Sequence, residues 1–315
     1  MSYSTVIVHL DLGSTAERRV KLAGSLADRF DARLIGVAAQ PCYLPVSGIA
    51  TACAPGLVEN EQDRIRDELA QAEAVFRRGA GARNSIEWRS AISMPVPFIA
   101  EQARAADLIV VSQKVQSDDS AWRFGVSPEE LVLTVGRPVL IASPYDSDFS
   151  AQRVIVAWKD TREARRAVSD ALPVLKAAEE VFVVAIGDET RRAGVEDVAA
   201  YLLRHGIEST TVLRQDAPAG VADEIMKMAE QEQADLIISG CVRLQSDARV
   251  DVWWGHTGAS EGRSGVLSDV ALRGRASRAG AYQRGYYYLH KHQTKPRARR
   301  MRDASGLVGS PSQRA

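Results

Sequence analysis

Four polar or small residues come directly after apolar runs that are typical of buried strands. Asp11 follows VIVHL and Lys159 follows VIVAW, while Ser112 and Gly240 end the runs ADLIVVS and ADLIISG. In open α/β sheets, ligands bind beyond the carboxyl ends of the strands, where the strand order reverses. A strand that runs into a glycine is also a common entrance to a phosphate-binding loop. The sequence therefore predicts a ligand site at these strand ends.

The polar residues form no pattern of a known catalytic or metal site. The chain has no G-x-S-x-G turn, no H-E-x-x-H motif, no Walker lysine loop and no paired carboxylates at strand ends. Asp11 and Asp160 are single acids without an evident base partner. The cysteines Cys42, Cys53 and Cys241 have no CxxC spacing, which argues against zinc or a disulfide framework. We therefore expect no enzymatic activity, no catalytic residue and no metal.

The apolar runs occur twice in the chain, which indicates an internal repeat. TVIVHLDL (5–12) resembles RVIVAWKD (153–160), and AADLIVVS (105–112) resembles QADLIISG (233–240). Continuous runs rich in Val and Ile are typical of parallel strands that are buried on both faces. Amphipathic helical patterns lie between these runs, and strands alternating with helices predict right-handed crossovers in a parallel sheet.

This alternation predicts an α/β fold with two doubly wound, Rossmann-like parallel-sheet domains, 1–146 and 151–240. The predicted strands are 5–11, 33–39, 85–91, 107–112 and 138–143, then 153–158, 180–186, 208–214 and 235–239. One long helix is expected at 161–178. The second domain is truncated after its fourth strand, which we expect to be left as an exposed edge. Residues 241–315 are expected to form an aberrant, disordered basic tail.

Composition and charge are those of a globular protein with one basic segment. The chain has 315 residues, 45% hydrophobic and 25% charged. No apolar run approaches the roughly 20 residues of a membrane span, and no signal-peptide pattern begins the chain, so a cytoplasmic protein is expected. The net charge of zero hides ten basic residues and one acidic residue in 274–315. Such a tail can bind nucleic acid.

Together, residues 1–240 resemble the universal stress protein family in its tandem form. Each domain of that family has strand order 3-2-1-4-5 and a first strand ending like V-x-x-D-x-S. After the fourth strand comes a loop, G-x2-G-x9-G followed by Ser or Thr, which wraps the phosphates of ATP in nucleotide-binding members. The resemblance implies a stress-response protein whose ligand-binding residues are Asp11, Ser14 and Gly125 in the first domain, and Asp160 and Gly240 in the second.

Both loops depart from the family's pattern. In the first domain, Ser112 and Val115 stand where two glycines belong, and Val126 replaces the Ser or Thr. In the second domain, Arg243 and Trp253 stand at the positions of the second and third glycines. Glycine matters there because backbone N–H groups must approach the phosphates closely. We therefore expect no ATP binding by the family's mode in the first domain, and ATP is a cofactor only by resemblance.

The codons beyond Gly240 suggest a hypothesis for the lost loop, a one-nucleotide insertion near codon 241. In the neighbouring frame, each codon joins the last two bases of one codon to the first base of the next, and we call this an overlap. Trp253 and Trp254 are both encoded by TGG, so their overlap is GGT, which encodes glycine. The next overlap, with Gly255, is GGG, also a glycine. The first of these glycines restores the spacing of the family's loop. The remaining overlaps permit GAYGYSRMREWTFGGVTRELL from residue 240 and a stop codon at residue 272.

These observations predict a non-enzymatic, cytoplasmic stress-response protein that binds a nucleotide or a protein partner. A weak ATP-binding or ATP-hydrolysing switch is one alternative. A nucleic-acid binder acting through the basic tail is another, although the frame hypothesis makes that an accidental property. The two domains are expected to pair with each other or to form a homodimer, an unidentified protein partner stays open, and no membrane is involved.

Overall fold

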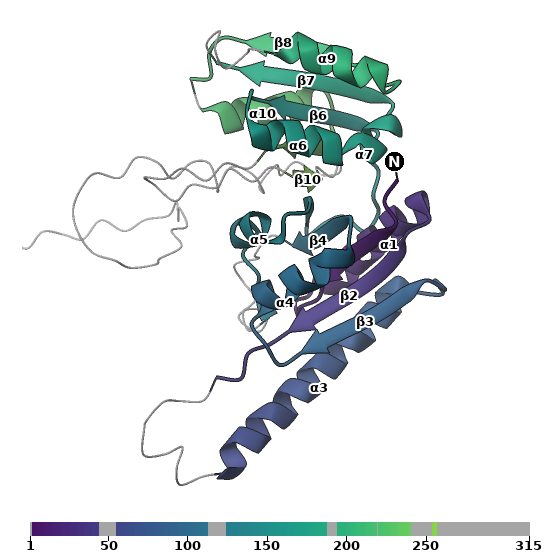
Figure 1. Cartoon of the computed structure of the whole chain (residues 1–315), viewed down its shortest axis with the longest axis vertical. Coiled ribbons are helices and arrows are strands. Elements are labelled where there is room, and N and C mark those ends of the chain that lie inside the picture. The colour runs from purple at the N-terminus through teal and green to yellow at the C-terminus, as the bar shows by residue number, and fades with distance from the viewer. Residues whose placement is uncertain are drawn as a thin grey trace, which may run out of the picture. The chain divides into compact units, whose positions relative to one another are not determined.

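The computed structural model describes residues 2–43, 55–112, 124–187, 194–218, 220–240 and 254–256 (Figure 1). The chain divides into two units, Met1–Ala276 and Ser277–Ala315, and the second lies wholly outside the described residues. The expectation for the tail 241–315 therefore stays a prediction, except at 254–256. Within the described residues, no helix is both long and apolar enough to span a membrane.

The first half of the chain is a five-stranded parallel sheet with the order β3-β2-β1-β4-β5. Its strands are β1 Thr5–His9, β2 Arg33–Ala39, β3 Ile86–Ala91, β4 Leu108–Ser112 and β5 Val139–Ala142. Its helices are α1 Ala16–Phe30, α3 Pro55–Ala80, α4 Pro95–Gln102 and α5 Pro128–Val135, with a short 3-10 helix at Ala103–Ala105. This confirms the predicted doubly wound fold.

Both faces of the first sheet are buried under helices, as its continuous apolar strands predict. Successive side chains of a strand point to opposite faces. Val6 and Val8 of β1 accordingly belong to the cluster that contains residues of α1 and α3, whereas Ile7 belongs to the cluster with α4 and α5. Gly36 of β2 allows close packing of α3, because a Cβ atom there would lie 2.6 Å from the ring of Phe76.

The second half repeats this plan with four parallel strands in the order β9-β6-β7-β8. They are β6 Arg153–Trp158, β7 Glu180–Ile186, β8 Thr210–Arg214 and β9 Leu236–Ser239. Its helices are α6 Arg162–Asp170, α7 Leu172–Lys176, α9 Val195–Arg204 and α10 Val221–Gln231. The single helix predicted at 161–178 was wrong. Pro173 has no N–H group to continue a helix, and it lies in the first turn of α7, where that loss is harmless.

One short strand changes the expected edge of the second sheet. Strand β10, Trp254–His256, pairs antiparallel with β9 and, at one residue, parallel with β5. The prediction of an unpaired edge at the fourth strand was therefore wrong. Within the described residues, the second half nevertheless has neither a counterpart of α5 nor a parallel strand in the place of β5.

Candidate functional site

Asp11 lies two residues beyond β1, where the sequence predicts a ligand-binding carboxylate, but its partners are internal. The Oδ1 atom accepts a hydrogen bond of 3.0 Å from the N–H group of Gly13. The Oδ2 atom lies 2.9 Å from Nη2 of Arg19 on α1, and the two side chains are only 11% and 2% exposed. The carboxylate is thus bound within the domain on both of its oxygens.

Arg19 is held in this buried position by a second contact. Its Nε–H group donates a 2.9 Å hydrogen bond to the carbonyl oxygen of His9. Burial alone would raise the pKa of Asp11, but the charge of Arg19 and its hydrogen bonds lower it below its usual value. A buried ion pair of this kind costs about 3–5 kcal/mol to break from one side, because the remaining charge stays buried without a partner.

His9, the last residue of β1, connects this ion pair to the segment before α5. The side chain is 2% exposed, and burial lowers its pKa to about 4, so the imidazole is neutral near pH 7. A hydrogen bond with the backbone of Phe124 and the charge of Asp11 oppose that lowering. Phe124 is itself fully buried and precedes Gly125. The end of β1 and the entrance to α5 therefore lie together, as the predicted site requires.

The other predicted residues of the first half, Ser14 and Gly125, are both exposed. Ser14 lies in the turn between β1 and α1, next to the internally bound Asp11. The residue that sequence analysis missed is Ser127, the N-cap of α5, whose Oγ accepts a 3.3 Å hydrogen bond from the N–H group of Glu130. The pattern Ser-Pro-Glu-Glu was a visible signal, because Ser followed by Pro and then Glu is typical of a helix N-terminus. Glu129 and Glu130 place negative charge at this end.

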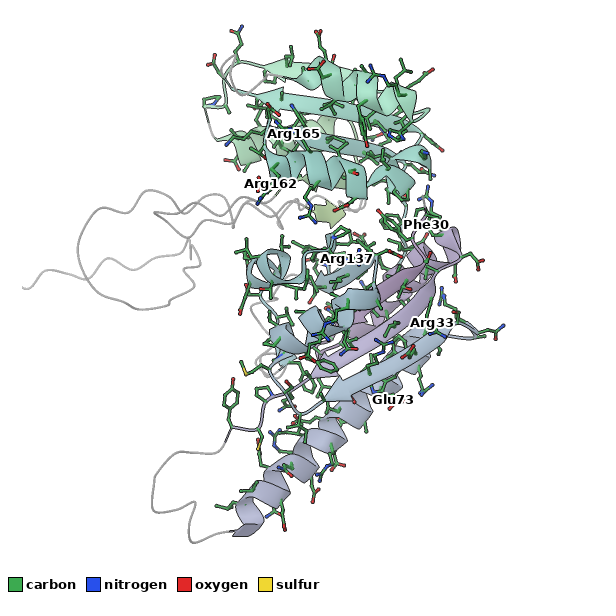
Figure 2. The ribbon with its side chains drawn as sticks, in the orientation of Figure 1. Phe30, Arg33, Glu73, Arg137, Arg162 and Arg165 are labelled. Carbon is green, nitrogen blue, oxygen red and sulfur yellow. The ribbon has the colours of Figure 1, made fainter. Side chains whose placement is uncertain are left out.

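The second half has a different arrangement at the equivalent strand end. Lys159 and Asp160 follow β6 and are exposed, and Thr161 is the N-cap of α6, with Oγ1 accepting a 3.2 Å hydrogen bond from the N–H group of Ala164. Asp160 Oδ1 lies 2.5 Å from Nη2 of Arg165, and these side chains are 40% and 60% exposed. Figure 2 shows Arg165 and its neighbour Arg162 on α6.

Gly240 follows β9 and lies against the first turn of α6. A Cβ atom at this position would lie 2.3 Å from the backbone nitrogen of Ala164 and 2.6 Å from the carbonyl carbon of Glu163. Only a glycine allows the chain to leave β9 along this path. The structure therefore brings two of the predicted residues, Asp160 and Gly240, to the N-terminus of the same helix.

Comparison with known proteins agrees with this fold. A universal stress protein from Archaeoglobus fulgidus DSM 4304 matches 79% of this chain and 90% of its own, with a TM-score of 0.57 and 13% sequence identity. The chain has the fold of the universal stress proteins. No protein-family model and no curated protein matches its sequence.

Two further solved structures are similar in parts. A universal stress protein in complex with cAMP is 27% identical, covering 46% of this chain and 99% of its own at a TM-score of 0.29. A putative universal stress protein from Pseudomonas aeruginosa UCBPP-PA14 is 16% identical, covering 76% of this chain and 83% of its own at a TM-score of 0.40.

Within the universal-stress-protein fold, the two strand ends differ in what they offer a ligand. The first has a neutralised carboxylate and two acidic residues at the start of α5, which repel an anion. The second has exposed Lys159 beside the N-terminus of α6, where Arg162 pairs with Glu163 at 3.0 Å and the helix dipole favours negative charge. No cluster of three metal-binding side chains occurs among the described residues.

Proposed function

We propose that this chain is a non-enzymatic universal stress protein whose second half binds the phosphate of a nucleotide weakly, at the N-terminus of α6. The observation that carries the proposal is the close packing of Gly240, the residue after β9, against the backbone of Ala164 in the first turn of α6. Lys159 supplies positive charge at the same place, next to the ion pair of Arg162 and Glu163. Weak binding is expected because Arg243 stands where the second glycine of the family's loop belongs.

The first half supports the proposal by contrast. Both oxygens of Asp11 already have internal partners, and Glu129 and Glu130 lie in the first turn of α5, whereas the first turn of α6 has Glu163, which pairs with Arg162. A nucleotide phosphate placed there would meet carboxylates at the helix end that usually attracts anions. We therefore assign no nucleotide to the first half.

Equilibrium binding of fluorescently labelled ATP to the full chain tests the proposal. Replacing Lys159 by Ala should weaken saturable binding about tenfold, the effect of one lost charged hydrogen bond of roughly 1.5 kcal/mol. The matched control is Lys176→Ala at the exposed end of α7, which makes the same change of charge and should leave affinity unaltered. Equal losses in both variants would reduce the effect to net charge and contradict the assigned site.

Each alternative function predicts a different result with the same purified protein. An absence of saturable ATP binding would leave a protein partner or self-association as the function. Release of inorganic phosphate from ATP, lost in Lys159→Ala, would indicate the weak hydrolase instead. DNA binding that falls steeply with salt and disappears on removal of 274–315 would indicate nucleic-acid binding by the tail, which lies outside the described residues.

A further inference from the structure

Strand register relates the two halves of the chain residue by residue. Val6, the second residue of β1, pairs with Leu108 of β4, and Val154, the second residue of β6, pairs with Leu236 of β9. Positions in and after β4 therefore correspond to positions 128 further along the chain. Ser112 and Gly240, the residues at the exits of the two strands, are a corresponding pair in this register.

The first half shows what the residues after its fourth strand contribute. Phe124 is fully buried, Gly125 leads into α5, and Leu131 of α5 is also fully buried. Strand β5 then pairs with β4, with Ile109 opposite Val139. In this chain, the positions corresponding to Phe124 and Gly125 hold Val252 and Trp253. The only described element there is β10, which runs antiparallel to β9.

We infer that residues from about 241 onward are read one nucleotide out of the frame that completes the second half. Tryptophan has a single codon, so the Trp253–Trp254 overlap can encode only glycine. This glycine takes position 253, which corresponds to Gly125. Any insertion that restores this frame must therefore place a glycine thirteen residues after Gly240, the separation between Ser112 and Gly125. This coincidence involves no choice among synonymous codons.

Overlaps that can encode more than one residue also permit residues that match the first half. The Val250–Asp251 overlap encodes Leu, Ser, Trp or a stop, and Trp is the residue found at the corresponding position, Trp122. The overlap that takes position 252 encodes Phe, Ser, Tyr or Cys, and Phe corresponds to the buried Phe124. Further along, Leu is permitted at position 268 and Met at 269, which correspond to apolar residues of β5.

The packing of Gly240 supplies independent support. Its contact with the backbone of Ala164 requires a glycine at the exit of β9, whereas the first half tolerates Ser112 at the corresponding position. The last residue before the proposed shift thus still has the glycine that its own contact with α6 requires. The neighbouring frame permits a second glycine three residues later, at the Arg243–Leu244 overlap.

The nucleotide sequence of the gene between codons 235 and 275 tests the inference, independently of any ligand. We expect the neighbouring frame to encode Trp and Phe at positions 250 and 252, and to stay open as far as codon 272. A stop codon before that point, or any other residue at either of these two positions, would overturn the inference. Failure of ATP binding would leave this test unaffected.

A second measurement compares two full-length proteins. One is the present chain, and the other is the corrected chain, which is read in the neighbouring frame after Gly240. If the second frame supplies the missing helix and parallel strand, its unfolding temperature should be higher by about 5 °C or more. Limited trypsin digestion should cut the present chain after residue 240 at least tenfold faster than the corrected one. Equal unfolding temperatures together with equal cleavage rates would overturn the inference.

Discussion

The two halves of the chain contain the same acid–arginine pair in opposite environments. In each half, an Asp near the end of the first strand lies beside an Arg four residues after the Thr that begins the following helix. Asp11 and Arg19 are buried, whereas Asp160 and Arg165 are largely exposed. The turn explains this difference, because Asp11 precedes Thr15 by four residues and Asp160 precedes Thr161 directly. A longer turn lets the first carboxylate reach beneath α1.

One sequence motif can therefore serve either the core or the surface, depending on the length of the connection. The buried pair closes the first strand end, and the exposed pair leaves the second open to solvent.

Replacing Arg19 by Met should have the largest effect on stability. The charge of Asp11 would remain buried without its partner, so the free energy of unfolding should fall by about 3–5 kcal/mol in urea denaturation at pH 7. Adding Asp11→Asn should restore part of the loss, because the unpaired charge is then removed. A loss below about 1 kcal/mol would show that the pair behaves like a surface contact and would break the comparison.

Lowering the pH should destabilise the first half through His9. Its pKa in the folded chain, about 4, is below the unfolded value of 6.5, so protonation favours the unfolded state. The stability from keeping His9 neutral is fully present above pH 6.5 and is lost as the pH falls toward 4, by about 3 kcal/mol at most. Urea denaturation at pH 7 and 4.5 should show this loss in the natural chain, and His9→Asn should reduce it. An unchanged loss in the variant would contradict the role of His9.

The residues at the ends of β4 and β9 can be exchanged, and the two substitutions should cost unequal amounts of stability. Gly240→Ser places a side chain against the backbone of Ala164 and should cost about 1–3 kcal/mol. Ser112→Gly, the reverse change in the first half, should cost about 1 kcal/mol or less, chiefly through chain entropy. Thermal unfolding of the two variants measures both values. Equal costs would mean that the two exits are equally crowded.

Replacing Arg165 by Met should have the smallest effect. Exposed ion pairs contribute about 0–1 kcal/mol, so the free energy of unfolding should change by no more than that. The same urea titration that is used for Arg19→Met provides the measurement. A larger loss would mean that the second pair is also structural and that the halves are more alike than their exposures indicate.

The sequence predicted the strands and their parallel orientation, because continuous Val- and Ile-rich runs leave few alternatives to a buried parallel sheet. It did not predict the ion pair of Arg19, because the partners are eight residues apart across a turn whose path depends on tertiary packing. Arg18 and Arg19 look equivalent in the sequence, and only the folded helix places one toward the core. The break before α7 was missed although Pro173 marked it, because the apolar spacing continues through the proline.

The sequence placed two candidate residues at neighbouring strand ends, and their role in binding stays a prediction. The strand ends do bring Asp160 and Gly240 to the N-terminus of α6, as the rule for open sheets implies. Asp11 lies where it was expected, but its neutralisation depends on a side chain from another element. The close contact that requires Gly240 was equally invisible, because it involves the backbone of a helix about 75 residues earlier in the chain.

The buried pair of Asp11 and Arg19 also constrains how the chain can change over generations. Neither residue can be replaced alone without leaving an isolated charge in the core, so a single mutation that reopens the first strand end is penalised before any benefit appears. The pair is thereby entrenched, and freeing the carboxylate position for a ligand would need two coordinated substitutions. Asp160 and Arg165 are under no such restriction, so each of these two exposed residues can be replaced alone at little cost in stability.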